Sequence, residues 1–85
     1  MRSEFSTGDI ENLAILSRLK LRKMGYKVET EINSVGGRYG CVYYFNNGKI
    51  YTTGLDSKDD CARKIKALND NLEDLAVKYC VSDNL

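Results

Sequence analysis

The chain has 85 residues, 42% of them hydrophobic and 29% charged, which is typical of a globular protein and excludes disordered, collagen-like and low-complexity classes. Thirteen basic and twelve acidic side chains leave a net charge of +1, so the strongly basic balance of a dedicated nucleic-acid domain is excluded and any basic site must be local. The length predicts a single domain over residues 1–85.

Residue types that common active sites and membrane segments require are missing or scarce. The chain contains no histidine, which is the usual general base near neutral pH and the commonest metal ligand. Cys41, Cys61 and Cys80 lack the spacing of a disulfide framework or a thiolate metal site. No run has the length of a membrane span or a secretory signal. We therefore expect a cytoplasmic protein that is not an enzyme, with reduced thiols, no metal or cofactor and no membrane contact.

The first predicted element is a helix over residues 7–24. Ser6 and Asp9 have the spacing of a helix start, and Gly25 follows where a helix commonly ends. One face of the helix is apolar at helical spacing and should pack on the core.

A second face of the same helix carries Ile15, Leu16 and Leu19. Three large aliphatic side chains on the outside of a helix favour a protein partner or a homodimer. The alternative is that another part of the chain covers them.

Three strands are predicted to follow the helix. Residues 26–33 alternate between apolar and polar side chains, and residues 38–46 are rich in aromatic and β-branched residues. Residues 34–37 are expected to form a flexible connection between these two strands. Residues 49–54 should return antiparallel as the third strand.

The pair Asn47-Gly48 predicts a two-residue type I′ hairpin between the second and third strands. Counting outward from this turn, Tyr44 lies opposite Tyr51, so both rings should share one face of the sheet. Paired tyrosines are able to stack unpaired bases; their structural alternative is to complete a core.

The last predicted element is a long helix over residues 58–80. Ser57 and Asp60 repeat the helix-start spacing, and an apolar stripe follows. Its outward side is basic in the first half and acidic in the second, which is opposite to the preference set by the helix dipole. The expected fold class is thus α+β in the order α-β-β-β-α, a three-stranded antiparallel sheet with two helices packed on one face.

The charged and apolar positions form two candidate binding sets. Basic side chains neutralise RNA phosphates, although they also solvate ordinary helix faces. The candidate RNA-binding residues are Lys58, Arg63, Lys64, Lys66, Arg38, Arg22 and Lys23. The candidate protein-binding residues are Ile15, Leu16, Leu19, Tyr44, Tyr51, Asp70, Glu73 and Asp74.

The order of elements resembles the double-stranded RNA-binding domain over residues 12–79. Residues 43–54 are similar to that family's hairpin, and Asp56-Ser57-Lys58 lies where its second helix begins. The resemblance implies that the first helix, the loop between the first two strands and the start of the second helix contact the grooves of A-form RNA. The chain departs from the family after Lys58, where two acidic residues and an alanine stand in place of further lysines, and in the loop, which lacks proline and histidine.

The chain also resembles, in size and lack of catalytic residues, the small phage-encoded proteins that neutralise bacterial defence systems. This resemblance implies RNA and a toxin endoribonuclease as partners in the cytoplasm of a bacterial host cell, with the chain acting as a non-catalytic inhibitor. Two alternatives stay open, which are a plain RNA-binding module of the double-stranded RNA-binding type and a protein-only inhibitor of the anti-CRISPR type.

Overall fold

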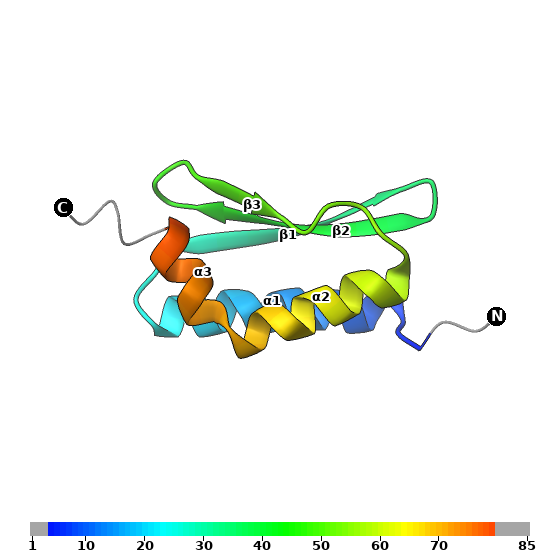
Figure 1. Cartoon of the computed structure of the whole chain (residues 1–85), viewed down its shortest axis with the longest axis horizontal. Coiled ribbons are helices and arrows are strands. Elements are labelled where there is room, and N and C mark those ends of the chain that lie inside the picture. The colour runs from blue at the N-terminus through cyan, green and yellow to red at the C-terminus, as the bar shows by residue number, and fades with distance from the viewer. Residues whose placement is uncertain (1–3, 80–85) are drawn as a thin grey trace.

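The computed structural model of the chain describes residues 4–79, and these form one three-stranded sheet with all helices on one side of it (Figure 1). The strands are antiparallel in the order β1-β2-β3. The predicted α+β class and α-β-β-β-α order are confirmed, except that the last helix is in two parts. The elements are α1 (Thr7–Lys23), β1 (Val28–Val35), β2 (Arg38–Phe45), β3 (Ile50–Thr52), α2 (Lys58–Asp70) and α3 (Leu72–Tyr79).

Helix α1 starts with the capping box that its sequence predicts. The Asp9 backbone N–H donates to Ser6 Oγ at 3.1 Å, and the Ser6 N–H donates to the Asp9 carboxylate at 2.9 Å. The helix ends before Gly25, whose φ of +100° lets the chain turn back toward β1. The same pairing at Ser57 and Asp60 starts α2, with the Asp60 N–H donating to Ser57 Oγ at 3.2 Å.

The connection between β1 and β2 is a tight turn and not the flexible segment that we predicted. Val35 pairs with Arg38, which leaves only Gly36 and Gly37 in the loop. Their φ angles are +57° and +79°. Two consecutive positive φ angles define a type I′ turn, and two glycines adopt them without steric cost. The type I′ turn that we predicted at Asn47-Gly48, between the second and third strands, thus occurs here instead, between the first and second strands.

The hairpin between β2 and β3 has a three-residue loop, Asn46-Asn47-Gly48, so the predicted two-residue turn is wrong. Gly48 has a φ of +90°, whereas no described non-glycine residue has a positive φ. The Gly48 N–H donates to Phe45 O at 3.0 Å, and the Asn47 side chain accepts from the Lys49 N–H at 2.9 Å. Asn47 is therefore held in a type I turn by its own side chain.

The longer loop shifts the strand register by one residue from the predicted one. Tyr44 lies opposite Ile50, and Tyr43 lies opposite Tyr51. A shift of one residue moves a side chain to the other face of a sheet. Tyr51 thus joins Tyr43 on the face that the helices cover, while Tyr44 remains on the open face.

The sheet ends at a close backbone approach that positions the start of α2. A Cβ atom at Gly40 would lie 2.2 Å from Gly54 O, so only glycine fits there. Beyond this crossing, Tyr39 and Asp56 exchange two backbone hydrogen bonds of 2.7 and 2.9 Å. The buried Thr53 hydroxyl also accepts from the Cys41 N–H at 2.9 Å.

The predicted helix over residues 58–80 is interrupted at Asn71, which has a φ of −135°. Helix α3 turns from there toward the sheet (Figure 1). Its Tyr79 ring stacks on Phe45 at 5.4 Å between centroids and meets Tyr51 edge-on at 5.5 Å. The break closes one end of the core with aromatic rings, which a straight helix would not reach. The last predicted helical residue, Cys80, lies outside the described residues.

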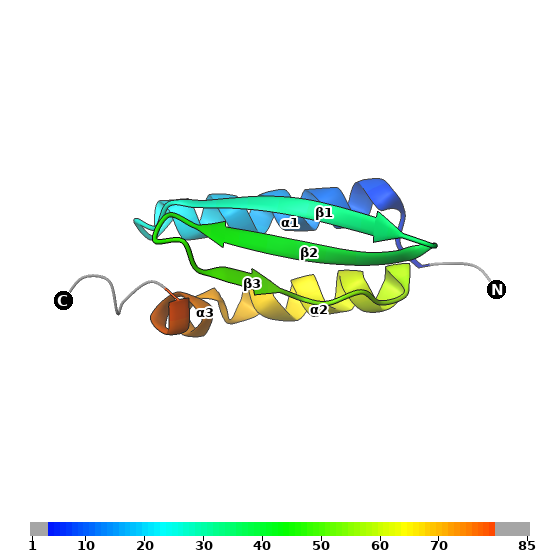
Figure 2. The same ribbon diagram turned by 90° about the horizontal axis from the view of Figure 1, so that it is seen from above.

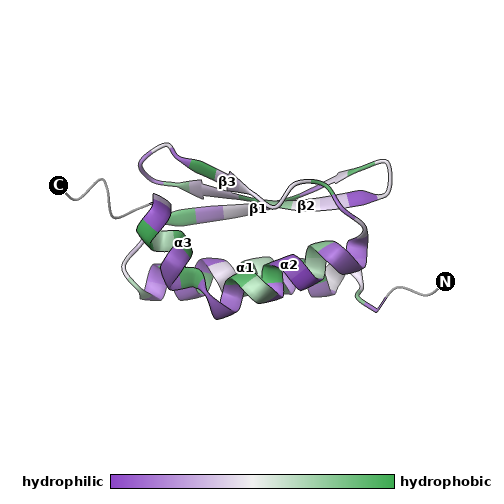
Figure 3. Ribbon diagram, viewed as in Figure 1, coloured by the Kyte–Doolittle hydropathy of each residue, from purple (hydrophilic) through white to green (hydrophobic). Residues whose placement is uncertain are grey.

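Helices α1 and α2 lie side by side and run in the same direction beneath the sheet, α1 on the β1 side and α2 on the β3 side (Figures 1 and 2). Hydrophobic and hydrophilic residues alternate along both (Figure 3). Apolar side chains fill the space between the layers, including Ile10, Leu21 and Ile65. A polar cluster lies in the same layer, where Ser17 bonds to Asn69 and, at 2.9 Å, to the Tyr43 hydroxyl.

Candidate nucleic-acid and protein interface

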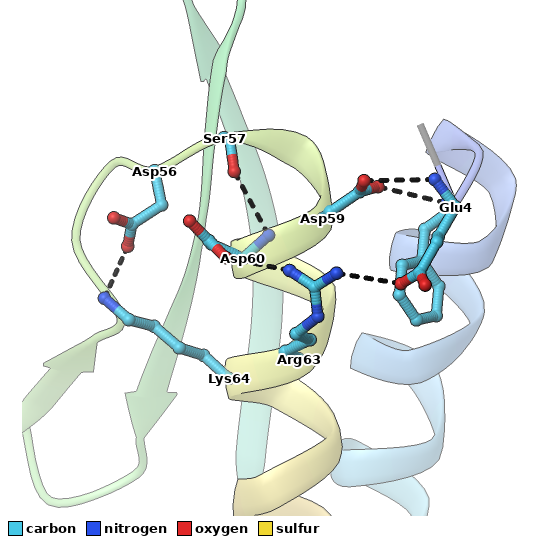
Figure 4. Close-up of polar contacts among 8 residues, drawn as sticks. Glu4, Asp56, Ser57, Asp59, Asp60, Arg63 and Lys64 are labelled. Atoms are coloured by element: carbon cyan, nitrogen blue, oxygen red, sulfur yellow. Dashed lines mark hydrogen bonds and ion pairs between the residues drawn. The ribbon is translucent and has the colours of Figure 1, made fainter. Parts of the chain in front are cut away.

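The basic candidates at the start of α2 already have acidic partners within the chain (Figure 4). Arg63 pairs with Glu4 at 2.8 Å and with Asp60 at 2.9 Å. Lys64 pairs with Asp56 and also donates to Thr53 O at 3.2 Å. Hydrogen bonds to these carboxylates raise the pKa of both basic side chains. An incoming phosphate would have to compete with the internal carboxylates for both cations.

The other two α2 candidates lie over aromatic rings. Lys58 Nζ is 5.8 Å from the centroid of Tyr39, and Lys66 Nζ is 5.6 Å from that of Phe5. Arg38 lies on the same end of the molecule at the β1–β2 turn, is exposed, and forms no ion pair within residues 4–79.

Asp59, in the first turn of α2, ties this helix to the segment that precedes α1. Its carboxylate accepts from the Glu4 N–H at 3.0 Å and from the Phe5 N–H at 3.1 Å (Figure 4). Both bonds lower the pKa of Asp59, and the bond from the Glu4 N–H has the larger effect. The start of α2 thus carries a negative charge that is already bonded within the chain.

The remaining basic candidates lie at the opposite end of α1, where the chain enters β1. Arg22 Nε donates to Val28 O at 3.2 Å, and its guanidinium pairs with Glu29 at 2.5 Å. Lys23 and Lys27 are exposed and form no ion pair within the described residues. Positive charge at this end is therefore available to a ligand.

A hollow of about 460 Å³ opens at this place, on the edge of the sheet. Two tyrosines, two basic residues and an amide contribute to its lining, together with Gly25, Val28 and Glu29. We call the surface formed by these residues and the neighbouring Lys23 the α1–β1 corner: Arg22, Lys23, Tyr26, Lys27, Tyr44 and Asn46.

The sequence predicted Arg22, Lys23 and Tyr44 of this corner and missed Tyr26, Lys27 and Asn46. Tyr26 was predicted as the first residue of a strand over residues 26–33, whereas β1 begins at Val28, and the Tyr26 side chain is half-buried against the core. The signal that points to it is Gly25, because a helix-ending glycine turns the next residues toward the end of that helix.

Tyr44 and Tyr51 do not form the shared surface that we predicted. Tyr44 is 39% exposed on the open face of the sheet. Tyr51 packs under the sheet, 5.9 Å from the ring of Tyr43 and against Tyr79. The cause is the one-residue register shift, which leaves Tyr44 as the only β2–β3 candidate ring on the open face.

The predicted apolar face of α1 is exposed, since the other described elements leave it uncovered. Ile15 and Leu16 are each 41% exposed, and Leu19 is 55% exposed. We call these three residues the α1 stripe. The stripe lies on the helix that carries Arg22 and Lys23 one turn further on, so basic and apolar candidates share one element.

The acidic candidates of α2 and α3 lie beside basic residues of α1. Asp70 and Glu73 line one groove with Lys20 and Lys23, and Lys20 donates to Asn69 O at 3.4 Å. Because the helices are parallel, the basic end of α1 meets the acidic end of α2, and Glu4 meets Arg63 at the other end. This arrangement accounts for the reversed charge order of α2 by internal complementarity. Asp74 is exposed in α3.

The two described cysteines lie in the core. Burial raises the pKa of Cys41 to about 12 and also raises the pKa of Cys61, so both are protonated thiols at neutral pH. Cys80 lies outside the described residues. Within residues 4–79, no three cysteine, aspartate or glutamate side chains converge as a metal site would require. None of the helices in that range combines the length and apolar character needed to cross a bilayer.

Comparisons with protein-family models, with curated proteins and with solved structures gave no match to this chain.

Proposed function

We propose that this chain is a non-catalytic inhibitor of a host defence nuclease, a toxin endoribonuclease, and that it binds both RNA and protein. The observation that carries the proposal is that one helix, α1, carries both the exposed α1 stripe and, one turn further on, Arg22 and Lys23 of the α1–β1 corner. In its small size, and in the RNA and protein binding proposed for it, the chain resembles the coliphage protein TifA, an inhibitor of the endoribonuclease ToxN.

The RNA part of the proposal depends on the chemistry of the corner. Lys23 and Lys27 supply charge that no ion pair within residues 4–79 neutralises, and Tyr44 offers an exposed ring. Basic side chains beside aromatic rings are the usual means by which proteins hold single-stranded nucleic acid without reading its sequence.

The protein part depends on the α1 stripe. Large aliphatic side chains grouped on a surface mark protein interfaces when they stay uncovered. Leu19 of the stripe lies one turn before Arg22 and Lys23, so a ribonuclease bound along α1 would reach the basic end of this helix. The chain would then inhibit by occupying the enzyme's RNA path, with the apolar contact supplying affinity and the RNA bridging both proteins.

The test is affinity purification of the tagged chain from a bacterial lysate, with and without RNase. We expect an absorbance ratio at 260 and 280 nm that indicates nucleic acid, and a ribonuclease that is lost with RNase. Replacing both Lys23 and Lys27 by glutamate should remove the RNA, and Leu19→Asp should remove the protein. Arg38→Glu is the matched control, since it reverses an exposed charge at the other end of the molecule.

Each other pattern contradicts the proposal in a defined way. If Arg38→Glu and Lys58→Glu abolish RNA binding while the corner variant retains it, the chain uses the surface of the double-stranded RNA-binding family. If no RNA is present and the protein partner is kept after RNase, the chain is a protein-only inhibitor. The internal pairing of Arg63 and Lys64 favours this second candidate over the duplex-binding one.

A further inference from the structure

We propose that the α1–β1 corner takes an unpaired RNA base stacked on the ring of Tyr44, so that the chain prefers single-stranded RNA to duplex. This inference rests on the RNA binding proposed above. It adds the class of RNA and the residue that recognises it.

The hollow has the size and lining of a site for one nucleotide. Its volume of about 460 Å³ falls within the range of about 300 to 1,000 Å³ that small-molecule sites occupy. Tyr26 and Tyr44 supply aromatic surface, and the Asn46 amide carries both donors and an acceptor for a base edge.

The charges of the corner suit a phosphate on either side of that base. Glu29 is the acidic residue in the lining, and Arg22 pairs with it at 2.5 Å, which compensates its charge. Lys27 is then the positive charge in excess within the lining, whereas the neighbouring Lys23 lines a separate groove with Lys20, Asp70 and Glu73. The Tyr44 hydroxyl donates to Glu31 at 3.5 Å, a long and exposed contact that leaves the face of the ring open.

A duplex does not fit these features. Bases in a duplex are already stacked on each other, and proteins read it by shape across two minor grooves and the major groove between them. The elements that would span those grooves here carry Asp56, Asp59 and Asp60. The corner is at the opposite end of α1 and offers one hollow, which only a base outside a stack is able to enter.

The test measures fluorescence anisotropy of a labelled twelve-nucleotide oligouridine and of a labelled 16-base-pair RNA duplex. We expect tighter binding of the oligouridine. Tyr44→Ala should weaken that binding by about 5-fold or more, the loss that removal of one base–aromatic stack gives, and Tyr44→Phe should preserve it. Ile50→Ala is the matched control, because Ile50 lies directly opposite Tyr44 on the open face and has no ring. Circular dichroism verifies that each variant is folded.

The outcomes separate this inference from the proposed function. If oligouridine binding is unchanged in Tyr44→Ala, or if the duplex binds as tightly, the inference is wrong while RNA binding stands. If neither RNA binds the wild-type chain, the RNA part of the proposed function fails and this inference fails with it.

Discussion

Replacing Gly40 by alanine should destabilise the fold by about 2 to 4 kcal/mol. The added Cβ would lie 2.2 Å from Gly54 O and 3.1 Å from the Gly54 carbonyl carbon. Both are backbone atoms, so no side-chain rotation relieves the clash, and the segment after β3 must move by roughly 1 Å. That movement weakens the two hydrogen bonds between Tyr39 and Asp56, each of which contributes about 1 kcal/mol. Overpacking adds about 1 to 3 kcal/mol.

Urea unfolding followed by far-ultraviolet circular dichroism measures this loss. For a chain of this size the free energy of unfolding falls by about 1 kcal/mol per molar urea, so the midpoint should drop by about 2 M or more. Gly8→Ala is the control, since the nearest atom to its Cβ is Ser6 Oγ at 3.7 Å. That variant should be as stable as the wild type or slightly more stable. A Gly40→Ala midpoint within experimental error of the wild type would refute the argument.

Three further predictions concern the core and a turn. Iodoacetamide at pH 8 should label Cys41 and Cys61 only after unfolding, as peptide mass spectrometry would reveal. Burial raises the Cys41 pKa from 9.0 to about 12. The protonated thiol therefore contributes fully to the free energy of unfolding below pH 9, and that free energy should fall by about 1.4 kcal/mol per pH unit from there to pH 12. Labelling in the folded state would contradict this. Ser17→Ala should cost about 1 to 3 kcal/mol in urea unfolding, because it leaves the buried Tyr43 hydroxyl without the bond that Ser17 makes, and a double-mutant cycle with Tyr43→Phe should show coupling between the two sites. Additive effects would exclude that coupling. Gly36→Asn should leave the melting temperature nearly unchanged, whereas Gly36→Val should lower the free energy of unfolding by about 1 to 2 kcal/mol. The reason is that asparagine tolerates the left-handed φ of +57° and a β-branched residue does not. Equal stabilities of the two variants would count against the type I′ assignment.

Local patterns were sufficient to predict the order of elements. Ser6 with Asp9 and Ser57 with Asp60 start the two helices as their spacing indicates. Features that depend on three-dimensional partners were not predictable in this way. The break at Asn71 involves neither glycine nor proline, and it serves to bring the ring of Tyr79 onto Phe45.

The turn chemistry shows why the predicted site was only partly right. Asn47-Gly48 has a sequence suited to a two-residue turn, but the pair Gly36-Gly37 adopts that turn, and the Asn47 side chain stabilises a longer loop. The shift of one residue removed Tyr51 from the open face and left Tyr44 there. Likewise, the reversed charges of α2 suggested an external partner because the parallel course of α1 cannot be read from either helix alone.

The parallel course of α1 and α2 also determines where the molecule should open first in acid. Side by side, the two helices place their electropositive amino ends together, and two carboxylates bond across this junction, Asp59 to the Glu4 and Phe5 backbone and Glu4 to Arg63. Because those bonds lower the pKa of Asp59, the junction holds in mildly acidic solution and is released as the pH falls through that lowered pKa. The contact between Lys20 and Asn69 O at the other end involves no carboxylate, so the two helices should separate from their amino ends while their carboxyl ends stay together.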